Sequence, residues 1–83
     1  MKPTIYLANN YHQCALVKAF VKESGVDTNI HNIDLSTVQP PKEVFVYPVL
    51  SIGADLIAYG EDIIDYYKKK LIKHVLILNI LDR

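Results

Sequence analysis

The sequence predicts a small α/β domain in which a four-stranded mixed sheet carries helices on both faces. Three observations lead to this prediction. Strand-like, helix-like and strand-like segments follow one another within the first 35 residues, and that order implies a crossover connection and a parallel pair of strands. Two short apolar runs around a glycine turn then predict a hairpin. A second amphipathic segment near the end of the chain predicts a closing helix.

Composition excludes several classes of protein. The 83 residues are 51% hydrophobic and 22% charged, which is too apolar for a disordered chain. Nine basic side chains balance nine acidic ones, so no net field favours nucleic acid or an anionic membrane, and we expect neither as a partner. A single cysteine excludes an internal disulfide, and the three histidines lack metal-ligand spacing, so we expect no metal site.

The chain shows no sign of a targeting or membrane segment. The residues after Met1 become polar too early for a secretory signal. The longest nearly apolar run, residues 44–50, is too short to span a bilayer. We therefore expect a cytoplasmic protein.

The first two elements are a strand and a helix. Residues 4–8 are β-branched, aromatic and apolar, which predicts a buried strand. Apolar positions over residues 11–24 recur close to every 3.6 residues, which predicts a helix. We expect Asn10 to cap that helix, with Gln13 reaching back as in a capping box. Gly25 is placed to end it in a left-handed conformation.

A second strand, a connection and a hairpin follow. Residues 28–35 alternate imperfectly between apolar and polar, which fits a half-covered strand parallel to the first. Pro40–Pro41 prevents a helix through that point but can open a short one at Lys42. Residues 48–52 and 55–59 flank a glycine-containing turn, which predicts an antiparallel hairpin.

The last helix begins at Glu61 and Asp62, because acidic residues favour the positive end of a helix. Its apolar stripe continues past residue 72, although the β-branched residues of 74–81 also permit an added strand. This tail carries more apolar side chains than one helix face needs, so we expect self-association or docking through them. The residues concerned are Val75, Leu76, Leu78 and Leu81.

This order of elements is that of the thioredoxin-like plan, and diagnostic residues resemble those of glutaredoxins. The resemblance extends to the glutaredoxin-like redoxins that donate electrons to ribonucleotide reductase. Tyr11-His12-Gln13-Cys14 resembles their Cys-x-x-Cys motif with the first cysteine replaced by tyrosine. Tyr47–Pro48 resembles the family's proline before the third strand, which is often cis. Gly60 and Asp62 resemble the glycine and aspartate that begin the family's last helix.

The resemblance covers about residues 3–72 of a single domain, residues 1–83, and leaves residues 73–83 as an apolar extension. In the family, the first cysteine attacks a disulfide and the second resolves the mixed disulfide. Because Tyr11 forms no thiolate, a dithiol cycle within one chain is excluded. Cys14 matches the second, buried cysteine of the family.

Two functions remain open. The favoured interpretation is a protein-binding module that uses the former active-site surface and needs no cofactor. The resemblance implies that the loop before Pro48 lies against the motif, so that Tyr11 and Tyr47 meet there, and an aromatic pair favours a protein or peptide partner. The expected binding surface consists of Tyr11, His12, Gln13, Tyr47, Pro48, Gly60 and Asp62.

The alternative is a monothiol oxidoreductase or glutathione-binding protein with Cys14 as its catalytic residue and glutathione as its cofactor. This interpretation requires a reachable thiol. Glutathione carboxylates in the family usually meet a basic residue near the motif, but Ala8-Asn9-Asn10 precedes the motif here. The nearest basic residue beyond Cys14 is Lys18.

Overall fold

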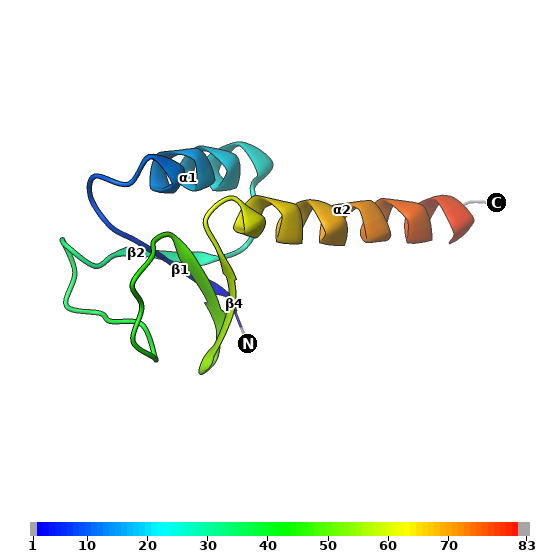
Figure 1. Cartoon of the computed structure of the whole chain (residues 1–83). Helices are drawn as coiled ribbons and strands as arrows, with labels where there is room; N and C mark the ends of the chain where they lie inside the picture. Colours follow the sequence, from blue (N-terminus) through cyan, green and yellow to red (C-terminus); the bar gives the residue numbers. More distant parts are fainter. Residues whose placement is uncertain (1, 82–83) are drawn as a thin grey trace.

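The computed structural model describes the backbone of residues 2–81 and the side chains of residues 2–71. It is an α/β structure with one four-stranded mixed sheet, as the sequence predicts (Figure 1). The elements are β1 (Thr4–Leu7), α1 (His12–Ser24), β2 (Asn29–Asn32), β3 (Val49–Ile52), β4 (Asp55–Tyr59) and α2 (Asp62–Leu81).

The strands lie in the order β2-β1-β3-β4. β1 and β2 are parallel, with Ile5 opposite Ile30, whereas β1 and β3 are antiparallel, with Ile5 opposite Leu50. β3 and β4 form the expected hairpin. The central strand β1 is therefore paired on both sides, and its Ile5 is fully buried.

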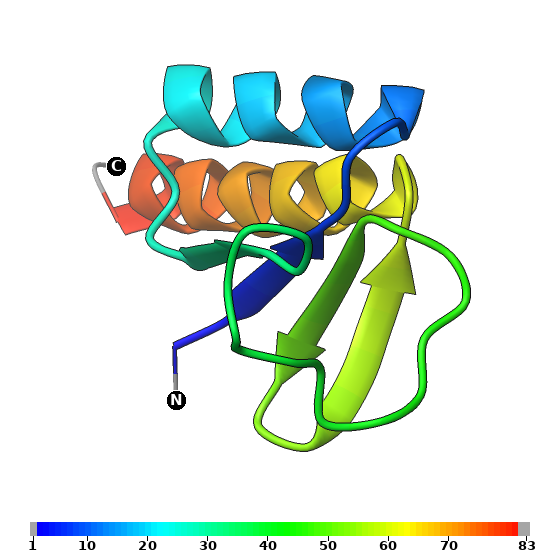
Figure 2. The same ribbon diagram turned by 90° about the vertical axis from the view of Figure 1, so that its left-hand side faces the viewer.

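Both helices cover the same face of the sheet, so the expectation of helices on both faces is wrong. One core joins the sheet to both helices through Ile5, Leu7, Cys14, Val17, Val21, Leu50, Ile63 and Tyr67. Burying the apolar faces of α1 and α2 against this face removes a large apolar area from water, which is the main stabilising term of the fold. Figure 2 shows α1 and α2 side by side above the strands.

The opposite face is covered by an irregular connection. The short helix that the prolines could open at Lys42 is absent, and residues 33–48 form turns and bends between β2 and β3. Proline lacks the N–H that a helix interior needs, so this proline pair favours an irregular path. Figure 2 shows the connection passing in front of the sheet. Tyr6, Val49 and Ser51 alternate toward this face and are nonetheless buried.

The ends of α1 differ in how well the sequence predicts them. Asn10 does not cap the helix: the N-cap residue is Tyr11, without a side-chain cap, and its carbonyl accepts a hydrogen bond from the Cys14 N–H at 3.1 Å. Asn10 instead takes a left-handed conformation with φ 68°, which asparagine tolerates better than most residues. The C-terminal prediction is confirmed, because Gly25 is left-handed and its N–H donates to Val21 O at 3.0 Å.

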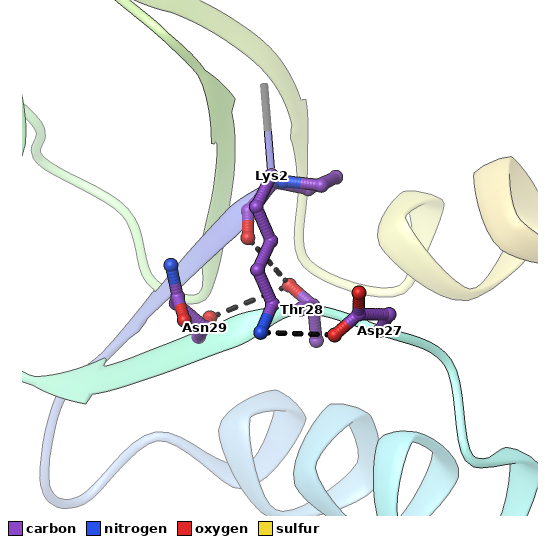
Figure 3. A network of polar contacts seen from close by, with 5 residues as sticks. Lys2, Asp27, Thr28 and Asn29 are labelled. Carbon is purple, nitrogen blue, oxygen red and sulfur yellow. Dashed lines mark hydrogen bonds and ion pairs between the residues drawn. The ribbon is translucent and has the colours of Figure 1, made fainter.

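A small cluster of polar contacts joins the N-terminal ends of β1 and β2 (Figure 3). The Thr28 hydroxyl donates to the carbonyls of Pro3 at 3.0 Å and Asn29 at 3.3 Å, and the Asn29 N–H donates to Pro3 O at 2.9 Å. Lys2 Nζ lies 2.9 Å from Asp27 Oδ1 in an exposed ion pair. Such a pair contributes little stability, so the main-chain contacts fix this edge of the fold.

α2 runs as one helix to Leu81, which settles the ambiguity over residues 74–81 in favour of a helix. Figure 1 shows its distal half extending past the sheet. The side chains expected to self-associate, Val75, Leu76, Leu78 and Leu81, lie outside the described side chains. None of the helices described between residues 2 and 81 combines the length and apolar character needed to cross a membrane.

Candidate functional site

The structure brings together two tyrosines that lie 36 positions apart in the chain. The ring centroids of Tyr11 and Tyr47 are 5.9 Å apart and the planes meet at 68°, an edge-to-face arrangement. Tyr11 stands immediately before α1 and is 43% exposed, whereas Tyr47 is half-buried. The prediction that these two side chains meet is confirmed, and they form a half-exposed aromatic surface.

Pro48 and Gly60 connect this aromatic pair to the start of α2. The Tyr47–Pro48 peptide bond is cis, and Pro48 is fully buried. The Gly60 N–H donates to the Pro48 carbonyl at 2.9 Å. Gly60 has a φ of 58°, and the Gln13 side-chain oxygen occupies the space that a Cβ would need. Gln13 therefore packs over Gly60, and only glycine suits this position.

Within the described part of the chain, no hydrogen bond uses the N–H or the carbonyl of Tyr47. Burial raises the pKa of the Tyr47 hydroxyl, and the nearby Tyr11 and Asp34 raise it further. The hydroxyl is therefore a neutral hydrogen-bond donor at physiological pH. This loop offers a main-chain donor, a main-chain acceptor and an aromatic ring side by side.

Three polar residues that sequence reasoning missed position the loop before Tyr11. The Asp34 carboxylate accepts a hydrogen bond from the Asn9 N–H at 2.7 Å, and the Asn32 side chain donates to Asn9 Oδ1 at 3.0 Å. The Asp34 N–H in turn donates to Asn32 Oδ1 at 2.9 Å. Asn9 and Asp34 come shortly after β1 and β2, and Asn32 is the last residue of β2. All three therefore lie at the carboxyl edge of the parallel pair, where functional groups often collect in α/β sheets. That placement was a signal in the sequence for all three.

The same network explains why the second strand ends early. The Ile33 N–H still donates to Leu7 O at 2.8 Å, but Leu35 and Ser36 both donate to Asn32 O at 3.1 and 2.9 Å. Both bonds close a turn directly after β2. The strand therefore ends at Asn32 rather than at Leu35, the end that its alternation predicts.

Cys14 lies in the interior rather than on this surface. It is 5% exposed and belongs to the core shared by the sheet and both helices. Burial raises the pKa of its thiol, although polar contact with the Ala8 backbone partly opposes that effect. Because the thiolate is the reactive form, a buried thiol with a raised pKa is a poor nucleophile at neutral pH.

His12 and Asp62 lie at the border of the surface. His12 is the first residue of α1 and is exposed, and no hydrogen bond to it is found among the described side chains. Asp62 is the first residue of α2 and lines a separate pocket between β4 and α2. The structure thus joins Tyr11, Tyr47, Pro48, Gly60 and Gln13 into one patch and leaves His12 and Asp62 beside it.

Among residues 2–71, no group of three or more His, Cys, Asp or Glu side chains is arranged to hold a metal ion. Comparison of the chain with family models, with curated proteins and with solved structures gives no match.

Proposed function

We propose that this chain is a glutaredoxin-like, thioredoxin-fold protein that binds an extended peptide segment of another protein. The binding surface is the former active-site patch, in which Tyr11, Gln13 and Tyr47 are accessible and the buried Pro48 and Gly60 hold the backbone in place. His12 and Asp62 border it. The observation that carries the proposal is the edge-to-face pair of Tyr11 and Tyr47, beside a Tyr47 main chain that takes part in no hydrogen bond among the described residues.

The chemistry of this patch suits an extended peptide. In the fold that the chain resembles, the residue before the proline pairs with an extended peptide or with glutathione. Such main-chain hydrogen bonds supply affinity, and neighbouring side chains supply selectivity. The half-exposed ring of Tyr11 adds apolar contact area at a small cost in side-chain entropy. A peptide with an aromatic or aliphatic side chain next to its pairing residue is therefore the best fit.

The alternative function, a monothiol reaction at Cys14 with glutathione, needs a reachable thiolate. The 5% exposure of Cys14 and the raised pKa of its thiol both oppose it. We also propose a cytoplasmic location, since a free cysteine is typical of a reducing compartment.

Selection of a random peptide library on the folded chain, followed by calorimetry with the selected peptide, tests the proposal. Tyr11→Ala should weaken binding about tenfold or more, because an aromatic anchor is lost. Tyr59→Ala is the matched control, since Tyr59 is also 43% exposed but lies on β4. Cys14→Ala should bind as the wild type does. Loss of binding in Cys14→Ala with full binding in Tyr11→Ala would instead support the thiol function.

We also propose that the chain self-associates through the distal half of α2. The residues expected to take part are Val75, Leu76, Leu78 and Leu81. Support comes from the continuation of the helix to Leu81, past the sheet, since an apolar helix segment is stable when another helix covers it. Sedimentation velocity over a dilution series should show a dimer that Leu78→Asp dissociates. A monomer at all concentrations would rule this association out.

A further inference from the structure

One segment of the connection between β2 and β3 has the sequence of a strand but belongs to no strand of the sheet. Residues 44–47 read Val-Phe-Val-Tyr, and such β-branched and aromatic residues favour strands. The structure nonetheless gives them an irregular, bent path outside the sheet. Figure 2 shows the connection passing in front of the sheet. The local preference of this segment is therefore not met within the chain.

The main chain around this segment is unpaired as well. Among the described residues, no hydrogen bond uses an N–H or a carbonyl of residues 42–47. Pro40–Pro41 precedes this stretch and the buried Pro48 follows it, and proline has no N–H to donate. The stretch between the prolines has about the usual length of a strand. Its row of unpaired donors and acceptors is complementary to an extended main chain.

The apolar side chains of the segment are largely open to solvent. Phe45 is 78% exposed and Val46 is 52% exposed, whereas Val44 is half-buried. Phe45 lies two positions before Tyr47, so the two rings would project from the same face of the segment in an extended conformation. Extension of the segment therefore adds Phe45 to the aromatic surface that Tyr47 already forms with Tyr11.

We propose that residues 43–47 straighten into a strand that pairs with the bound peptide, with Phe45 as a second aromatic anchor beside Tyr47. This inference rests on the peptide-binding function proposed above and specifies its ligand. Side chains that face Phe45 and Tyr47 across a strand pair are two residues apart in the peptide. The peptide therefore carries two apolar side chains separated by one residue.

The unpaired main chain selects this ligand over the alternatives. A helix already uses its main-chain groups internally, and a small organic molecule has no row of alternating donors and acceptors. An extended peptide supplies that row, as in other cases of strand addition. A second copy of residues 43–47 could also supply it, but the continuity of the segment with the Tyr11–Tyr47 pair favours a partner peptide.

NMR titration of the full chain with Ac-Thr-Val-Thr-Val-Thr-NH2 tests the proposal. We expect amide shifts and intermolecular nuclear Overhauser contacts between the peptide main chain and residues 43–47. Ac-Thr-Val-Val-Thr-Thr-NH2 has the same composition but adjacent valines, and it should bind about threefold more weakly, because only one valine can face the two rings. Equal affinity for the two peptides, or no binding of the first at about 5 mM, would overturn the inference.

The contacts also separate this inference from the function on which it rests. Shifts at Tyr11, Gln13 and Tyr47 without contacts to residues 43–46 would retain peptide binding at the patch and overturn the strand pairing. Failure of the library selection described above would instead overturn peptide binding itself. Contacts between residues 43–47 of labelled and unlabelled copies of the chain, without peptide, would assign the segment to self-pairing and overturn the proposal.

Two exposed side chains of the same connection provide a matched pair of variants. Phe45→Ala should weaken binding of Ac-Thr-Val-Thr-Val-Thr-NH2 about fivefold, because an aromatic anchor is lost. Leu35→Ala is the control, since Leu35 is 80% exposed but lies before the proline pair, and it should bind as the wild type does. Unchanged affinity in Phe45→Ala, or equal losses in the two variants, would overturn the role of Phe45.

Discussion

The interior and the surface differ sharply at the point where α1 begins. Cys14 is 5% exposed and packs with both helices and the sheet, whereas Tyr11, about one helical turn away, is 43% exposed and contacts Tyr47 from a distant loop. The interior side is apolar and closely packed. The surface side carries half-exposed aromatic rings and main-chain groups without internal partners.

Within residues 11–14, Cys14 therefore contributes to the stability of the fold, and Tyr11 is available for binding. Cys14, which the proposed glutaredoxin resemblance aligns with a resolving cysteine, serves the core, and Tyr11, which it aligns with the nucleophile, is 43% exposed. Interior substitutions should therefore change the free energy of unfolding, and surface substitutions should change affinity.

A pair of leucines provides the strongest contrast. Leu50 is fully buried in β3 and Leu35 is 80% exposed in the connection between β2 and β3. Leu50→Ala should lower the free energy of unfolding by about 2–5 kcal/mol because it leaves a cavity. Leu35→Ala should change it by about 0.5 kcal/mol or less. Urea denaturation measures both, and equal losses would contradict the division between interior and surface.

Gly60 lies where interior and surface meet. Gly60→Ala should lower the free energy of unfolding by about 1–2 kcal/mol, because a residue with a Cβ is strained at positive φ. The new Cβ should also displace the Gln13 side chain. Gly25→Ala is the matched control, since Gly25 has a φ of 69° and open space around a new Cβ. Denaturation gives the two costs, and the NMR signals of the Gln13 side-chain amide report its displacement. Unmoved Gln13 signals in Gly60→Ala would contradict this packing.

The thiol of Cys14 predicts a pH dependence of stability. Because the pKa of the thiol is raised in the folded chain, the unfolded chain loses the thiol proton at a lower pH. The contribution of the buried thiol to the free energy of unfolding is therefore fully present below about pH 8.5, the usual thiol pKa. As the pH rises toward the folded pKa, the wild type should lose at most about 1.4 kcal/mol per pH unit more than Cys14→Ala. Denaturation at about pH 8 and pH 9.5 measures this, and the tyrosines, which begin to ionise at the upper pH, contribute alike to both proteins. Parallel profiles would place the thiol in contact with water.

Substitution of Tyr67 by phenylalanine should give the smallest change in stability. Its hydroxyl is buried and finds no hydrogen-bond partner among the described residues, and burial raises its pKa. Tyr67→Phe should therefore leave stability within about 0.5 kcal/mol or raise it slightly, since an unsatisfied polar group is removed. Tyr59→Phe, on an exposed ring, is the control. A loss of more than about 1 kcal/mol of stability in thermal melts of Tyr67→Phe would show that the hydroxyl is hydrogen-bonded, with Thr28, whose polar contact opposes the rise in pKa, as the candidate partner.

Local sequence signals predicted most of the fold. Periodicity placed α1 and the hairpin, and Gly25 marked the end of α1 as a residue that accepts positive φ. The meeting of Tyr11 and Tyr47 was predicted only from the resemblance to glutaredoxins, which places the proline loop against the motif. These features depend on neighbours in the chain or on a known arrangement of strands.

The errors arose where distant contacts decide the local structure. The cap assigned to Asn10 failed because its backbone is left-handed and the helix begins after Tyr11. The hydrogen bond from the Asn9 N–H to the Asp34 carboxylate joins residues 25 positions apart, and no local sequence pattern predicts it. The missing helix after Pro40–Pro41 left both observed helices on one face, an outcome that depends on the path of the whole connection.

The reactivity of Cys14 tests the central claim most directly. The rate of labelling by a thiol reagent should be measured from about pH 5 to pH 9 for the folded chain and for the chain unfolded in urea. A structural thiol predicts slow labelling of the folded chain and rapid labelling only after unfolding, because burial limits access and disfavours the thiolate. Rapid labelling of the folded chain, with an apparent pKa below about 8.5, would contradict the binding function and support the monothiol enzyme.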